Sequence, residues 1–193
     1  MIKGERVILR AVEERDLPLI ARWRNDPEIA RFFFSPFPIN AGGQKKWYED
    51  LLADGRRIVF MIDSLEGQAV GMLGLDNIDY RNQQAELGLV VLDPGQRERR
   101  YAREAVILTI RYAFEELNLH RLVAAMYAFN RRIIEGAQWH GFQEEAVLRQ
   151  AAFSGGRFHD KVIMGLLREE WQARRGLEQG ERPRDGAVSK GGL

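Results

Sequence analysis

An arginine-rich loop at the start of a long helix is the part of this chain whose residue types and spacing could do chemistry. The loop, residues 93–100, reads DPGQRERR and leads from an apolar strand into an amphipathic helix expected over residues 101–118. The first N–H groups of a helix have no partner within the helix, and the helix dipole favours negative charge there. A strand, a polar loop and a helix N-terminus in this order predict a site for a phosphate-bearing ligand.

The arginines of the loop support this interpretation, because cations at a helix N-terminus oppose the dipole unless an anion lies between them. Contact with phosphate is predicted for Arg97, Arg99 and Arg100, since guanidinium groups pair bidentately with phosphate oxygens. The N–H groups of Tyr101 and Ala102, the first residues of the helix, are expected to point at the same phosphates. The alternative is an ordinary solvated run of charge.

Apolar strands flank this helix along the chain, over residues 85–92 before it and residues 120–127 after it. Hairpins are expected over residues 57–80 and 142–167. A helix that crosses between two strands of one sheet, combined with hairpins, predicts an α/β (α+β) fold. Its sheet would be mixed but mostly antiparallel, with helices on both faces.

Composition limits the classes of function. The 193 residues suit one globular domain, expected over residues 1–171, and residues 172–193 are rich in Arg, Glu and Gly without periodicity, so a disordered tail is expected there. A net charge of +1 gives no general attraction to nucleic acid or to a membrane surface. There is no cysteine, and the three histidines lack the spacing of metal ligands, so no metal site is expected. These features favour a cytoplasmic protein.

The ordered set of elements resembles the GNAT superfamily of N-acetyltransferases, and within it the branch that acetylates ribosomal-protein N-termini, polyamines and similar amines. The resemblance covers residues 6–171. The residues that carry it are RVILRAVEERDL at 6–17, Glu86, Asp93-Pro94, Tyr101-Ala102, Glu104-Ala105, AFEELNLHRL at 113–122, Asn130, Gly141-Phe142 and GRFHDKVIMGLLREEW at 156–171.

The resemblance implies a single-domain GNAT-like fold in which the strands over residues 85–92 and 120–127 splay apart and acetyl-CoA binds between them. Pantetheine would hydrogen-bond to the backbone of Leu89, Val90 and Val91 like an added strand. Asn130, expected as a helix N-cap, would also lie near the pantetheine. The acetyl group would pass from acetyl-CoA to a primary amine by direct attack in a ternary complex, because no cysteine is present to carry it.

Glu86 matches a glutamate that is frequent in this branch, and the resemblance implies that it accepts the amine proton as a general base. The alternative is a strand-end carboxylate that is paired with an arginine or solvated. The aromatic loop from Phe32 to Phe37, with Trp47 and Tyr48, lies where the family usually builds its acceptor site, and a small-molecule amine or a protein N-terminus would fit such walls. The alternative is that these rings close the core. The relatives include homodimers, so the resemblance is compatible with a homodimer.

The departures from the family pattern fall in the phosphate loop and at one helix position. The family's loop reads Gln/Arg-x-x-Gly-x-Gly/Ala, whereas residues 97–102 read RERRYA, which makes the loop degenerate. Glu98 and Arg100 stand where glycine is expected, and glycine allows close approach of the backbone and positive φ. Ala137 stands where the family often has the Tyr that protonates the thiolate. The alternative function is therefore a catalytically weak GNAT-fold protein that binds a coenzyme-like ligand or a protein partner.

Overall fold

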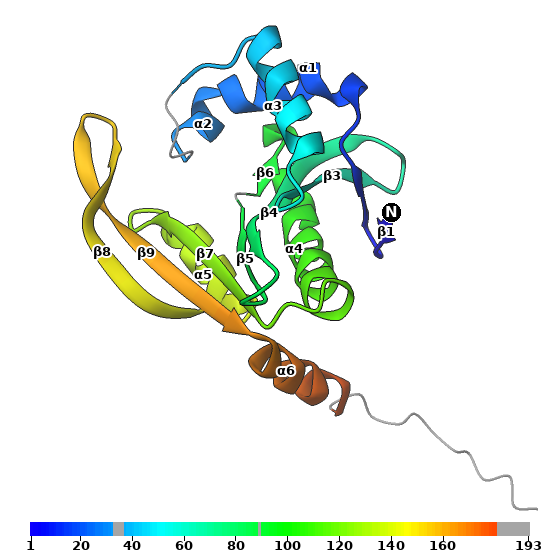
Figure 1. Cartoon of the computed structure of the whole chain (residues 1–193), viewed down its shortest axis with the longest axis vertical. Coiled ribbons are helices and arrows are strands. Elements are labelled where there is room, and N and C mark those ends of the chain that lie inside the picture. The colour runs from blue at the N-terminus through cyan, green and yellow to red at the C-terminus, as the bar shows by residue number, and fades with distance from the viewer. Residues whose placement is uncertain (33–36, 89, 181–193) are drawn as a thin grey trace, which may run out of the picture.

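The structure is a computed structural model that describes residues 1–32, 37–88 and 90–180, without the side chains of 97–99 and 176–180. One sheet organises these residues in the order β1-β2-β3-β4-β5-β7-β9-β8, with β6 paired to β4 (Figure 1). Only the β5–β7 pair is parallel among the pairs formed by the described residues. The strands are β1 (Ile2–Lys3), β2 (Val7–Ala11), β3 (Ile58–Ser64), β4 (Ala69–Asp79), β5 (Gln84–Leu87), β6 (Val91–Leu92), β7 (Arg121–Tyr127), β8 (Gln143–Ser154) and β9 (Arg157–Leu167).

Helices cover both faces of this sheet, as the sequence predicts. The helices are α1 (Leu17–Asn25), α2 (Pro27–Ala30), α3 (Ala41–Ala53), α4 (Tyr101–Arg111), α5 (Arg131–Trp139) and α6 (Arg168–Gly180). The single helix expected over residues 101–118 is α4 followed by a π-helical turn at Tyr112–Glu116. Figure 1 shows α1, α2 and α3 together at one end of the molecule, away from α6.

Alternation along β3 divides the core between the two faces. Phe60 and Ile62 belong to the cluster that contains the apolar side of α4, whereas Met61 belongs to the cluster formed with α1. Successive side chains of a strand point to opposite faces, so one strand supplies both clusters. The helical residues that meet them include Val106 and Ile110 from α4 and Ile20 and Trp23 from α1. Apolar packing on both faces therefore fixes the position of the central strands.

Two features differ from the sequence-based expectation. The apolar run at residues 85–92 forms two short strands, β5 and β6, with an interruption between them. Residues 172–180, expected to belong to a disordered tail, continue α6, and residues 181–193 lie outside the described residues. Trp171 is 7% exposed and packs against Phe114 with ring centroids 5.4 Å apart, so the first turn of α6 is anchored in the core.

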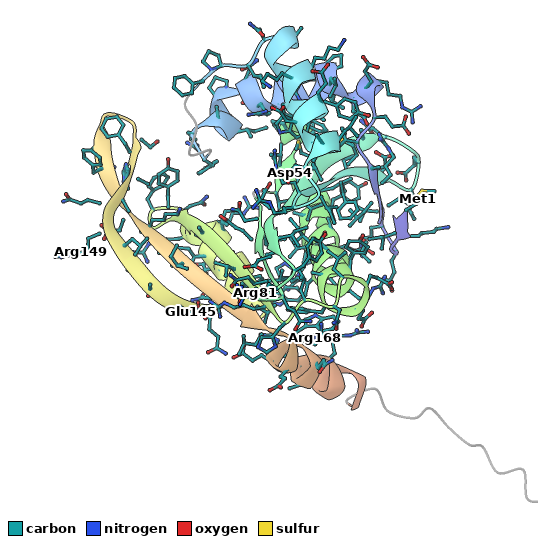
Figure 2. All side chains as sticks on the ribbon, in the orientation of Figure 1. Met1, Asp54, Arg81, Glu145, Arg149 and Arg168 are labelled. Carbon is teal, nitrogen blue, oxygen red and sulfur yellow. The ribbon has the colours of Figure 1, made fainter. Side chains whose placement is uncertain are left out.

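The long hairpin of β8 and β9 leaves the body of the molecule, with Glu145 near its base and Arg149 on its outer edge (Figure 2). Two shifts of register bend this hairpin. No helix formed by the described residues is both long and apolar enough to cross a membrane.

Candidate active site

A cleft opens where β5 and β7 separate. The two strands pair in parallel only as far as Glu86 and Val123, and β7 then continues to Tyr127 with β9 alone as its partner among the described strands. The chain beyond β5 stays with β4, to which β6 pairs further along. A cavity of about 820 Å³ lies in this opening, lined by Ala124, Ala125 and Met126 of β7 among others. The predicted splayed strand pair is therefore confirmed.

A β-bulge shapes the other wall of the cleft. Leu75 pairs with Leu87 and Met72 pairs with Val91, so the chain has three residues between these pairs where β4 has two. The N–H of Gly88 donates to the carbonyl oxygen of Gly74 at 2.9 Å, and a Cβ on Gly88 would lie 2.9 Å from Oδ2 of Asp76. A side chain at position 88 would therefore require the Asp76 carboxylate to move. The extra residue interrupts the regular ladder between β5 and β6.

Of the residues predicted to bind pantetheine, the structure places Val90 on this bulge. Val90 lines the cavity, whereas Val91 is 2% exposed and belongs to the short strand β6. Leu89 lies outside the described residues.

The N-terminus of α4 forms one end of the cavity, where Arg100 and Ala102 line it. Arg100 has φ 57° and ψ 17°, and its side chain makes no capping hydrogen bond. Position 100 is therefore a left-handed residue directly before the helix, which is the conformation that glycine adopts without strain. Tyr101 and Ala102 are the first residues of α4, as predicted. The side chains of Arg97 and Arg99 lie outside the described part of the structure.

Arg103 continues this end of the cavity and stacks on Trp139, with Cζ 3.1 Å from the ring centroid. The Trp139 ring meets His140 edge-on at 4.9 Å. Burial lowers the pKa of His140 to about 4, and the charges of Arg103 and Arg174 act in the same direction. His140 is therefore neutral near pH 7, and the positive charge in this region comes from arginine.

Asn130 occupies the N-cap position of α5, as predicted, but its side chain makes no capping hydrogen bond. The backbone carbonyl oxygen of Asn130 accepts hydrogen bonds from the N–H groups of Ile133 and Ile134 at 3.0 and 3.2 Å. The residue lines the cavity together with Ile133 and Ala137 of α5. Asn130 therefore starts the helix through its backbone, and its side chain is not committed to the cap.

Two carboxylates lie side by side at the opposite end of the cavity. Asp76 and Glu86 are directly paired across β4 and β5, and both line the cavity. Oε2 of Glu86 accepts from Nδ2 of Asn77 at 3.2 Å. Oδ1 of Asp76 accepts from Nε of Arg57 at 2.8 Å, in an ion pair whose side chains are about one-third exposed. Among the described side chains, Asp76 rather than Glu86 is the one paired with an arginine.

The first helices of the chain supply the remaining wall at this end. The cavity is lined here by Arg24 of α1, by Phe32, which follows α2, and by Trp47 of α3. Phe37, in contrast, is 81% exposed, and residues 33–36 lie outside the described residues. Cζ of Arg24 lies 5.9 Å from the Trp47 ring centroid. Burial lowers the pKa of Arg24, and the nearby charge of Arg57 lowers it further. An aromatic wall was predicted here, but the arginines were not.

One residue connects α1 to the phosphate loop. Oδ2 of Asp93 accepts from Nε1 of Trp23 at 3.0 Å and lies 3.4 Å from Nη2 of Arg22, while Oδ1 accepts from the N–H of Gly95 at 3.0 Å. The bond from Trp23 lowers the pKa of Asp93 despite its partial burial. The ionised carboxylate therefore fastens the start of the loop to a buried ring of α1.

Within the described ranges, no three His, Asp or Glu side chains are grouped as a metal ion would require. Among the lining residues that sequence reasoning missed are Arg24, Arg57 and Asp76. Only the register of β4 on β5 could have indicated Asp76, because that register places it opposite Glu86.

Residues 6–143 match the family described as Acetyltransferase (GNAT) domain, and the chain belongs to this family. The uncharacterized N-acetyltransferase p20 of Bacillus licheniformis is 31% identical over 86% of this chain and 96% of its own length. The putative ribosomal N-acetyltransferase YdaF of Bacillus subtilis (strain 168) is 26% identical over 88% of this chain and 95% of its own length. A crystal structure of spermidine N-acetyltransferase from Vibrio cholerae, in complex with CoA and spermine, has a TM-score of 0.83 at 24% identity. It covers 88% of this chain and 99% of its own, and this likeness shows the fold.

The family and the site agree. The protein is an N-acetyltransferase that takes its acetyl group from acetyl-CoA and transfers it to an amine. The predicted family and fold are confirmed.

Proposed function

We propose that the chain acetylates a primary amine of a small molecule or a protein N-terminus by direct attack, with Glu86 as the general base. The observation that carries this proposal is the place of Glu86. It is the last residue of β5 that pairs with β7, and it lines the cavity next to the bulge. A carboxylate at that point is within the space where an amine and an acetyl thioester would meet.

The coenzyme half of the proposal rests on the other end of the cavity. The phosphates lie at the N-terminus of α4, where the N–H groups of Tyr101 and Ala102 and the guanidinium of Arg100 meet them. Arg97 and Arg99 add charge from the same loop. The left-handed backbone of Arg100 lets the chain approach the phosphates although the residue is not glycine.

Pantetheine lies between the splayed strands, next to the backbone of Leu89, Val90 and Val91, and the side chain of Asn130 faces it. An N–H group of the bulge near Val90 stabilises the oxyanion that forms when the amine attacks. Glu86 takes the amine proton, directly or through water, as the C–N bond forms and the C–S bond breaks. No metal takes part, so activity is expected to persist after chelation.

The relatives named above are described as a putative ribosomal N-acetyltransferase and a spermidine N-acetyltransferase, so both small amines and protein N-termini are included as acceptors in the test. A homodimer is part of the proposal, and analytical ultracentrifugation measures it directly. Release of free thiol from acetyl-CoA, followed over a panel of amines and N-terminal peptides, tests the reaction itself.

The runner-up is a catalytically weak GNAT-fold protein, and Ala137 and the degenerate loop are the observations that favour it. It predicts that acetyl-CoA raises the melting temperature while no amine in the panel speeds thiol release. Thiol release that depends on an amine, with the acetylated amine identified by mass spectrometry, would exclude this alternative.

A further inference from the structure

Two arginines enter the acceptor end of the cavity from different elements. Arg24 comes from α1, and Arg57 directly precedes β3. Both side chains line this cavity, and the charge of Arg57 helps burial to lower the pKa of Arg24. Like charges repel, so a pair of them in one partly buried space favours a ligand with negative charge.

The charged groups follow one another across this end of the cavity. Arg24 and Arg57 both line it, Nε of Arg57 donates a hydrogen bond to Oδ1 of Asp76 at 2.8 Å, and Asp76 is paired across the strands with Glu86. Glu86 therefore stands at the carboxylate end of the series and Arg24 at the guanidinium end. An acceptor whose amine lies at Glu86 and whose body extends toward α1 reaches Arg24.

Arg57 keeps N–H groups with which it can bind such a substrate. Its Nε is used by Asp76, and its Nη groups make no hydrogen bond to any described residue. A guanidinium group has five N–H donors in a planar fork that matches a carboxylate. Asp76 orients the guanidinium group through Nε and leaves both Nη groups available to a substrate carboxylate.

The surroundings strengthen any charge pairing at this place. Trp47 of α3, Val59 of β3 and Met72 of β4 line the same end of the cavity. Apolar walls lower the local dielectric, so an ion pair between a ligand carboxylate and these arginines is stronger than it would be in water. A polyamine would bring a second ammonium group toward the arginines and would lose affinity.

We propose that the acceptor is an amine that also carries a carboxylate: Glu86 receives its amino group, and Arg24 together with Arg57 binds its carboxylate. The inference rests on the proposed function, since it needs Glu86 at the reacting amine. The chemistry is shared by two sources, a short ω-amino acid and a peptide with an acidic side chain close to its N-terminus.

A substrate series on the wild-type protein tests the inference without any mutation. Each ω-amino acid of a series of increasing length is compared with its own carboxamide, which keeps the nucleophile and removes the charge. We expect kcat/KM for the best acid to exceed that of its amide about tenfold or more, mainly through KM. Spermidine is expected to be a poorer acceptor than the best acid.

The outcomes separate the two levels of the proposal. If the amide or spermidine is preferred, or acid and amide are equal, the inference is overturned and the acetyltransferase stands. If no amine supports thiol release, the proposed function itself fails. Tripeptides that begin Ala-Asp and Ala-Asn distinguish the sources, because only a peptide acceptor gives the Asp form a higher kcat/KM than every ω-amino acid.

Two variants test the proposed role of Arg24 in binding the carboxylate. Arg24→Gln is expected to raise KM for the best acid about ten- to hundredfold and to leave KM for its amide unchanged. Arg56→Gln is the matched control, because the Arg56 side chain is 77% exposed and pairs only with Asp54 among the described residues. Melting temperature and acetyl-CoA affinity report whether each variant is folded. Loss of acid preference in both variants, or in neither, contradicts the inference.

Discussion

The left-handed backbone of Arg100 provides a prediction in which conformation and charge are measured separately. Arg100→Ala removes the guanidinium and keeps Cβ, whereas Arg100→Gly removes both. Since φ is 57°, Cβ is strained at this position, by about 1–2 kcal/mol for an L-residue. Glycine in turn loses about 0.4–1 kcal/mol through the larger entropy of the unfolded chain. The glycine variant should therefore be more stable than the alanine variant by about 0.5–1 kcal/mol.

For a chain of this size, about 1 kcal/mol shifts the melting temperature by about 2–4 °C. We expect scanning calorimetry to place Arg100→Gly about 2 °C above Arg100→Ala. Both variants should bind acetyl-CoA about tenfold more weakly than the wild type in calorimetric titration, because both lose one charge-assisted contact with phosphate.

Two results would refute this reasoning. An alanine variant as stable as the glycine variant would mean that position 100 is not left-handed in solution. Tighter binding of acetyl-CoA by Arg100→Gly than by the wild type would mean that the arginine obstructs the phosphate site and does not contribute to it.

Three further predictions concern the rest of the molecule. Glu86→Gln should lower kcat/KM by about 10²–10⁴-fold with acetyl-CoA affinity retained, and an unchanged kcat/KM would make Glu86 a structural residue. The pKa of His140 is about 4, below its usual value near 6.5, so the unfolded chain takes up this proton first as the pH falls. The free energy of unfolding should therefore drop by up to about 3 kcal/mol between roughly pH 6.5 and 4, and His140→Gln, compared by urea unfolding, should flatten this dependence. A chain ended after Trp171 should melt about 4 °C lower than one ended after Gly180, because it loses the 2.9 Å bond from Arg174 to the carbonyl oxygen of Trp139; equal melting temperatures would show that the rest of α6 adds no stability.

The parts of the fold that could be predicted are those in which neighbours in sequence determine the structure. The helix that begins at Tyr101 and the final hairpin have strong periodicity and clear turns, and both are present. The break between β5 and β6 was missed, since Gly88 sits in a continuous apolar run and its contact with Asp76 comes from another strand. Asn130 shows the same limit, because its N-cap position was predictable and the direction of its side chain was not.

The residues of the candidate site also divide into those that a local sequence pattern indicates and those that only tertiary packing brings together. Glu86 was identified because a known pattern contains it, and it lies in the cavity. Arg24 and Arg57 were missed, since no local pattern relates a residue of α1 to the start of β3. They line one cavity because α1 packs on the face of the sheet that contains Met61, while Arg57 is ion-paired with Asp76 of the neighbouring strand. Charges assembled by tertiary packing carry no signature in a single sequence.

The bond between Trp23 and Asp93 has a consequence for how the two substrates bind. Trp23 is 1% exposed in the core, and the next residue along α1 is Arg24, which faces the acceptor end of the cavity. Asp93 begins the loop that leads to the phosphate end. Binding of the coenzyme to the loop can therefore act through Asp93 and Trp23 on the position of Arg24. We therefore expect each substrate to change the dissociation constant of the other, and thermodynamic linkage requires the two factors to be equal.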